Sequence, residues 1–343
     1  MKRYVSVLLL SMFLLVLAPV SAQDDEALKV VASFSVLGDI VQNVGGEYID
    51  LSVIVGINSD THTFEPTPGD FVALSDADLI FENGLEFESF LDDMYTNSGS
   101  EAIRVEVSNG IDVLPFSEPV IEDGHLHTDE EESDDHNHAE EEASDDHDHA
   151  EEEESDDHDH AEEHEHGEFD PHWWMNPIQA IIAVENVRDT LMSLDPLNAE
   201  AYAENADAYI ISLQEMDIFI REQLLELPLD RRVIVTTHDS LGYFAEAYDF
   251  TILSALRSIS TEAAEPSPRE IADLIEVVES TGVVAIFAEN ISNPELIEQI
   301  ANAADVVVAP SLYTDALGDK DSDGSSYLDM LQYNVITIVE ALG

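Results

Sequence analysis

The sequence predicts an α/β protein with two lobes, each built on a mostly parallel β-sheet and joined by a long rigid helix. Short apolar runs rich in Val and Ile alternate with helical periodicity between residues 28 and 114, and the alternation returns after residue 229. A long helical stretch, residues 177–228, separates the two regions. Such alternation indicates βαβ units, whose parallel strands are covered by helices on both faces.

The first lobe, residues 23–176, contains a regular series of expected elements. Val-rich and Ile-rich runs predict its strands, and three- and four-residue apolar spacing predicts its helices. Glycines close the first of these helices. The expected strands are 29–34, 50–55, 78–83 and 102–108, and the expected helices are 35–46, 68–77 and 86–97.

The connector, residues 177–228, is predicted to be helical with a break near Asp195 and Pro196. A helix of this length is a natural backbone between two lobes. The second lobe, residues 229–343, then repeats the strand and helix alternation. Its expected strands are 231–237, 250–255, 283–290 and 305–310, and its expected helices are 242–249, 267–282, 293–304 and 325–342.

Residues 1–22 read as a secretory signal peptide. Lys2 and Arg3 precede an apolar run, and a small-residue cleavage site ends at Ala22. The run is shorter than the roughly 20 residues that span a bilayer, which disfavours an uncleaved anchor. Since the chain has no cysteine, it offers neither a disulfide nor a lipid-modified cysteine. We therefore expect a soluble periplasmic or secreted protein.

The charge balance excludes several classes of partner. Lys and Arg number 11 against 76 Asp and Glu, which gives a formal net charge of −65. Nucleic acid and anionic membrane surfaces both require a positive partner. The composition instead favours cations.

Residues 122–168 form an acidic, histidine-rich insertion in the first lobe. It holds ten of the 13 histidines and no lysine or arginine, and it repeats every 11 residues. An 11-residue period can indicate a helical supercoil, but only alanines recur at apolar positions, so we predict disorder. Its HxH pairs indicate loose collection of metal ions at low affinity. The alternative is a merely solvating acidic loop.

Three histidines lie outside this insertion: His62, His172 and His238. Each follows a predicted strand or lies in a loop, and Asp315 follows the strand predicted at 305–310. Parallel sheets present ligand-binding residues at the carboxyl ends of their strands. A single loop histidine is usually solvated, and a single loop aspartate usually forms a turn. Three imidazoles with one further donor make the tetrahedral shell that zinc prefers, so the set predicts a metal site in a cleft.

The surroundings of His172 contain both tryptophans of the chain. Asp170 and Pro171 precede the histidine, and Trp173 and Trp174 follow it. The indoles either exclude water around a ligand, or at least one of them is ordinary core at a lobe interface.

Five segments resemble, in chain order, the motifs of the zinc/manganese solute-binding proteins of bacterial ABC transporters. They are HTFEPTPGD, DPHWWMNP, TTHDSLGYFAEAYDF, EPSPREIADLIEVVESTGVVAIFAEN and LYTDALG. The resemblance implies a metal cleft between two α/β lobes and no enzymatic activity. It also implies delivery of the ion to a membrane permease that is driven by a cytoplasmic ATPase.

By the same resemblance, His62 and His172 are the metal ligands of the first lobe, and His238 and Asp315 those of the second. Glu289 is placed in a supporting position. A histidine at position 238 favours Zn(II), since imidazole suits zinc, while carboxylates suit harder ions. Asp315 leaves Mn(II) possible. We expect a monomer.

Two other classes of function stay open at this point. A zinc hydrolase would use three histidines and an open position to activate water, but the chain has no HExxH segment and Asp315 would fill that position. A metal-buffering or adhesive surface protein would need only the histidine-rich insertion and no cleft.

Overall fold

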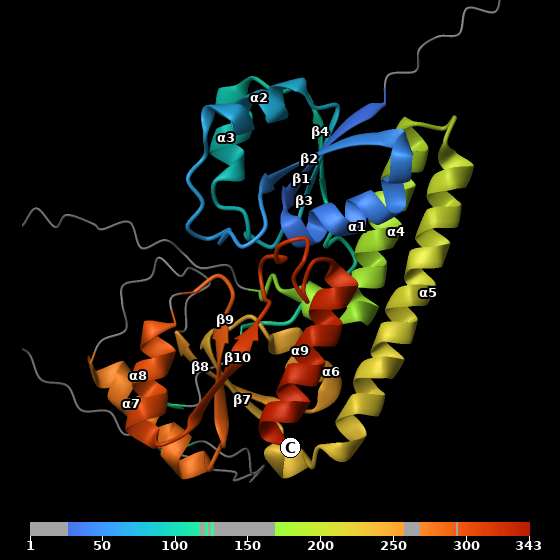
Figure 1. The fold of residues 1–343 in the computed structure, drawn as a ribbon. Helices are drawn as coiled ribbons and strands as arrows, with labels where there is room; N and C mark the ends of the chain where they lie inside the picture. The colour runs from blue at the N-terminus through green and yellow to red at the C-terminus, as the bar shows by residue number, and fades with distance from the viewer. Residues whose placement is uncertain (1–26, 117–120, 123–124, 127–168, 257–267, 293) are drawn as a thin grey trace, which may run out of the picture.

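The computed structural model describes residues 27–343, except 117–120, 123–124, 127–168, 257–267 and 293. Two lobes lie one above the other, and a long helix runs alongside both (Figure 1). The predicted two-lobed α/β architecture is confirmed. The predicted signal peptide lies outside the described residues, as does the histidine-rich insertion apart from residues 122, 125 and 126.

The first lobe is built on a four-stranded parallel sheet in the order β2-β1-β3-β4. Its two central strands, β1 and β3, are almost wholly buried, as is typical of strands whose sheet is covered by helices on both faces. The strands are β1 (Leu28–Phe34), β2 (Ile49–Val55), β3 (Leu79–Glu82) and β4 (Ile103–Glu106), and the helices are α1 (Ser35–Gly45), α2 (Pro68–Asp76) and α3 (Leu91–Ser98).

The start of α3 differs from the prediction. The sequence predicts a helix from residue 86, but the helix begins at Leu91. Gly84, Leu85 and Glu86 have φ values of 82°, 55° and 61°. A left-handed backbone cannot continue into a right-handed helix, so the predicted first turn is wrong.

Local signals fix the start of α2, which follows the loop that carries His62. Pro68 occupies the first turn, and Thr67 and Asp70 form a reciprocal capping box. The Asp70 carboxylate accepts from the Thr67 N–H at 2.7 Å. These contacts anchor the far end of the loop from β2 to α2.

The connector consists of two helices packed side by side, α4 (Pro177–Leu194) and α5 (Ala199–Gln223). The break lies at the predicted position, where Asp195 accepts from the Asn198 side chain and the Tyr202 hydroxyl at 2.7 and 2.8 Å. Helix α5 packs against α1 of the first lobe and α9 of the second (Figure 1). One apolar core therefore extends from the first sheet through α4 and α5 into the second lobe.

The second lobe contains two parallel strand pairs, β7–β8 and β9–β10, and β7 lies beside β9. A second, smaller apolar core lies in this lobe, where α7 and α8 pack on the strands. The elements are β7 (Val233–His238), α6 (Gly242–Tyr248), β8 (Thr251–Leu256), α7 (Pro268–Thr281), β9 (Ala285–Glu289), α8 (Glu295–Ala304), β10 (Val307–Leu312) and α9 (Tyr327–Leu342).

Several short elements complete the described chain. Strands β5 (Ile121–Glu122) and β6 (His125–Leu126) pair antiparallel. A bridge between Pro115 and Phe169 brings the two sides of the insertion together. Over the described ranges, no helix combines the length and the apolar character that crossing a membrane requires. The 3-10 turns are η1 (Gly46–Tyr48), η2 (Trp173–Met175), η3 (Leu224–Glu226) and η4 (Leu229–Arg231).

Candidate metal centre

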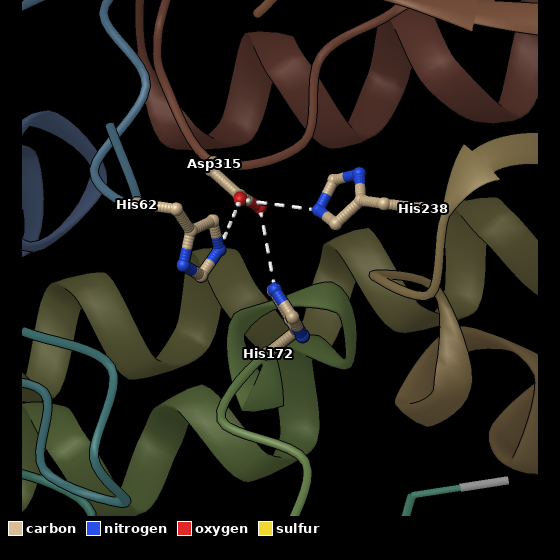
Figure 2. Close-up of side chains that lie close together, drawn as sticks. All are labelled: His62, His172, His238 and Asp315. Carbon is tan, nitrogen blue, oxygen red and sulfur yellow. Dashed lines mark hydrogen bonds and ion pairs between the residues drawn. The ribbon is translucent and has the colours of Figure 1, made fainter. Parts of the chain in front are cut away.

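The four residues singled out in the sequence come together between the two lobes. His62, His172, His238 and Asp315 each offer one donor atom, and these atoms all lie within 4.8 Å of one another. Figure 2 shows the three rings arranged around the carboxylate. The side chains come from four segments that are far apart in the sequence, and the structure brings all four into one cluster.

His62 lies in the loop between β2 and α2. Its backbone N–H donates to the Asp60 carboxylate at 2.8 Å, which bends the loop toward the cluster. The ring packs edge-on against Phe87, with 5.1 Å between the ring centroids. Its side chain is 4% exposed.

His172 is held by a carboxylate two residues earlier in the chain. The Asp170 Oδ1 atom accepts from the backbone N–H of His172 at 2.9 Å and lies 2.7 Å from its Nδ1 atom. The Asp170 N–H in turn donates to the Leu114 carbonyl at 2.8 Å. Because Nδ1 faces this carboxylate, the Nε2 atom is left to face the cluster.

His238 is the last residue of β7, and Glu289 is the last residue of the neighbouring strand β9. The Nδ1 atom of His238 lies 2.6 Å from Glu289 Oε2, and its backbone N–H donates to Oε1 at 3.1 Å. The resemblance placed Glu289 in a supporting position, and in the structure Glu289 contacts His238 directly. It orients this imidazole as Asp170 orients His172.

Asp315 lies at the centre of the cluster, in the loop after β10. Its Oδ2 atom is 3.2 Å from the Nε2 atoms of His62 and His238, and its Oδ1 atom is 3.6 Å from the Nε2 atom of His172. Both carboxylate oxygens therefore face imidazole nitrogens (Figure 2).

Several polar atoms of the cluster are buried without a hydrogen-bond partner in the described chain. They include His62 Nε2, His172 Nε2 and Asp315 Oδ1. A buried polar atom without a partner is costly, and such atoms need a reason to persist. Three imidazole nitrogens and a carboxylate turned toward one point form a donor set that suits a divalent transition metal.

The carboxylates control the protonation of the cluster. Burial of the His172 ring lowers its pKa, but the negative charges of Asp315 and Asp170 outweigh burial and raise the pKa to about 9. Burial likewise lowers the pKa of His238, and Glu289 and Asp315 raise it well above its usual value. Burial raises the pKa of Asp315, yet His238 and His172 hold that pKa well below its usual range.

The two tryptophans take different roles, and the sequence alone did not separate them. Both are fully buried. The Trp174 ring lies 5.2 Å from the His172 ring and 5.0 Å from Phe87, so it forms part of the apolar wall of the site. Trp173 packs against Trp174 at 5.7 Å. One indole therefore excludes water beside an imidazole, and the other behaves as core.

The role of Asp170 was missed in the sequence, although a local signal was present. An aspartate two residues before another residue often accepts from that residue's backbone N–H, and Asp170 and His172 have this spacing.

We expect Asp170→Asn to lower the pKa of His172 toward 6.5 in the metal-free protein, because one of the two charges that raise it is lost. An NMR titration of the His172 ring measures this value. Asp112→Asn, at an exposed position before the insertion, serves as the matched control and should leave it unchanged. A His172 pKa that stays near 9 in the Asp170 variant would contradict the assignment.

A family model described as "Zinc-uptake complex component A periplasmic" matches residues 30–341. The chain belongs to this family. The match covers almost the whole described chain, including all four residues of the cluster. The resemblance seen in the sequence motifs is thereby confirmed.

Curated relatives of this zinc-uptake family member extend over nearly its full length. Manganese-binding lipoprotein MntA of Halalkalibacterium halodurans is 33% identical over 322 residues, which cover 94% of this chain and 91% of the relative. Manganese ABC transporter substrate-binding lipoprotein PsaA of Streptococcus pneumoniae is 29% identical over 346 residues, covering 98% and 97%. These names describe binding proteins, and the expectation that the family member is not an enzyme is confirmed.

Solved structures share the architecture. The periplasmic zinc-binding protein TroA of Treponema pallidum has a TM-score of 0.73 and 26% identity, with 93% of this chain and 100% of that chain covered. An Mn-bound point mutant of a periplasmic metal-binding protein from Candidatus Liberibacter asiaticus has a TM-score of 0.72 and 25% identity, with the same coverage.

The predicted localisation is corrected by these relatives. Cleavage after Ala22 and the absence of cysteine predicted a soluble protein, but MntA, PsaA and Streptococcus sanguinis SsaB are named lipoproteins, which are held at a membrane. The prediction took the lack of cysteine as a sign of a free protein. That lack excludes only attachment through a cysteine of this sequence.

Proposed function

We propose that this protein captures a divalent transition-metal ion between its lobes and delivers it to the permease of an ABC transporter. The ligands in this proposal are His62, His172, His238 and Asp315. The permease and its cytoplasmic ATPase are the partners, and the ion is the transported substrate.

The convergence of four donor groups at one buried point carries the proposal. Their donor atoms lie within 4.8 Å of one another, and no more than 4% of any of these side chains is exposed. A buried site with its ligands already oriented by Asp170 and Glu289 needs little rearrangement to bind an ion. His238 ends a strand of the second lobe and Asp315 follows another, while His62 and His172 belong to segments joined to the first, so both lobes contribute to the site.

Zinc is the ion we propose as the preferred one. Three imidazoles and one carboxylate oxygen give the tetrahedral shell typical of Zn(II). For a given set of nitrogen and oxygen ligands, zinc also binds more tightly than manganese. The structural neighbour TroA, named as a zinc-binding protein, is consistent with this choice.

Manganese is the second candidate. The names of MntA and PsaA specify manganese, and both oxygens of Asp315 face the cluster. A carboxylate that binds through both oxygens would give five donor atoms, which suits Mn(II) better than a four-coordinate shell does.

A competitive titration distinguishes the two ions. We expect wild-type protein to take up zinc in preference to manganese, measured with equal concentrations of both ions and native mass spectrometry. In the His238→Glu variant the preference for zinc over manganese should be smaller, because a carboxylate replaces an imidazole. Wild-type protein that selects manganese would overturn the zinc proposal. Failure to bind either ion would overturn metal capture itself.

A further inference from the structure

Trp174 connects the segment of His172 to the loop of Asp315. It lies two residues after His172, in the turn η2. Its indole Nε1–H donates to the carbonyl of Thr314 at 2.9 Å. That carbonyl belongs to the peptide group directly before Asp315, 140 residues along the chain. A hydrogen bond at this place restricts the orientation of the Asp315 backbone.

The same residue makes a second contact with this loop. The backbone carbonyl of Trp174 accepts from the Tyr327 hydroxyl, and Tyr327 is the first residue of α9. The loop that carries Asp315 runs between β10 and α9. Trp174 is therefore joined both to the ligand's own peptide group and to the helix where the loop ends.

Besides the imidazoles that face the Asp315 carboxylate, other hydrogen bonds hold this loop to both lobes. The Leu317 N–H donates to the Ser35 hydroxyl of α1 at 3.0 Å, and the Leu317 carbonyl accepts from the Asn58 N–H at 2.8 Å. Asn290, directly after β9, accepts from the Thr314 N–H at 3.2 Å and donates to the Ala316 carbonyl at 3.0 Å. The Asn290 bonds hold the loop to the second lobe, and neither they nor the Leu317 bonds join it to the segment of His172. The indole of Trp174 makes that connection, and its ring also packs on His172.

We infer that Trp174 is a positioning residue for Asp315, holding this carboxylate in register with His172 when an ion is bound. The inference rests on the proposed function. Thr314 is fully buried, so loss of the indole N–H would leave its carbonyl without this donor and would remove one restraint on the peptide group before Asp315. The carboxylate oxygens would then leave the positions that face the imidazoles.

Trp173 supplies a matched control. It is also fully buried and adjacent in the sequence, but its Nε1 atom has no hydrogen-bond partner within the described chain. Replacing either tryptophan with phenylalanine removes one indole and keeps an aromatic ring. Only the change at position 174 removes the bond to Thr314.

The test measures zinc affinity and the rate of zinc release to a chelator. We expect Trp174→Phe to weaken binding by roughly 10- to 100-fold, mainly through faster release, as is usual for loss of a residue that orients a metal ligand. Trp173→Phe should stay within about threefold of wild type, because it loses no bond to the site. Equal effects of the two variants would overturn the inference.

A double-mutant cycle separates positioning from general damage. In an Asp315→Ala background, Trp174→Phe should weaken zinc binding no further, because the ligand through which it acts is gone. An undiminished effect in that background would overturn the inference and leave the proposed function intact. Wild-type protein that binds neither zinc nor manganese would overturn both.

A measurement on wild-type protein covers the case in which Trp174→Phe does not fold. The chain has two tryptophans, so ¹⁵N-labelled protein should show two indole N–H signals. We expect the Trp174 signal to shift strongly when zinc is added and the Trp173 signal to shift less, with assignment from Trp173→Phe. A Trp174 signal that is unmoved by bound zinc would contradict the inference.

Discussion

Asp315→Ala is expected to remove tight metal binding. Its two oxygens face all three imidazole nitrogens, at 3.2, 3.2 and 3.6 Å, and its side chain is fully buried. Loss of the carboxylate removes the negative charge closest to the ion and one of its donors. We expect the affinity for zinc to fall by more than the roughly 10- to 100-fold that loss of an outer partner costs. Isothermal titration with zinc measures the change.

The matched control for this variant is Asp319→Ala. Asp319 has the same chemistry and lies four residues later in the same loop, but it is exposed. It should leave zinc affinity unchanged. If Asp315→Ala binds zinc as wild type does, while alanine at His62, His172 and His238 removes binding, Asp315 is not a ligand.

Asp315→Ala should also change the metal-free protein. The pKa values of His172 and His238 are both raised in part by the Asp315 charge. Burial lowers both pKa values, and the Asp315 charge partly offsets that effect. Without this charge both pKa values should therefore fall. The variant thus reports on the electrostatics of the cluster even where no ion is added.

The positions of His238 and Asp315 could be predicted because they follow a general rule of parallel sheets. His238 ends β7, and Asp315 follows β10, so both lie at the carboxyl ends of strands. A run of Val and Ile predicts a strand, and the end of the run therefore predicts where the carboxyl end of that strand lies. The count of histidines outside the insertion then leaves few candidates, and the structure brings all of them together.

Other features depend on contacts between distant segments. The bond from Trp174 to Thr314 joins residues 140 positions apart, and no periodicity reveals which of two adjacent indoles makes it. The late start of α3 has a different cause. Leu85 and Glu86 adopt a left-handed backbone, although neither residue type favours it, so the surrounding fold overrides local preference there.

Metal affinity is expected to rise with pH up to about 9. His172 must lose its proton to bind an ion through Nε2, because Nδ1 faces Asp170, and its pKa in the metal-free protein is raised to about 9. Below that pH a proton competes with the metal. The affinity should increase roughly tenfold per pH unit for each proton that binding displaces. Zinc titrations between about pH 6 and pH 9 measure this slope.

The stability of the metal-free protein should follow the opposite trend. The pKa of His172 is higher in the folded chain than its ordinary value of 6.5, so the folded state binds its proton more tightly. This stabilisation is fully present below pH 6.5 and is lost as the pH rises through about 9. For His172 it amounts to about 3 kcal/mol. Urea unfolding of the metal-free protein at each pH measures it.

The two trends share one cause, and a variant tests whether that cause is His172. Asp170→Asn is expected to lower the pKa of His172, so the rise of zinc affinity with pH should level off at a lower pH. The loss of metal-free stability should move to lower pH with it, since both report the same proton. If the affinity curve stays in place while the stability curve moves, the proton that competes with the metal is on another group. His238 is then the group to test. Burial lowers the pKa of its ring, but the neighbouring Glu289 and Asp315 raise that pKa well above its usual value.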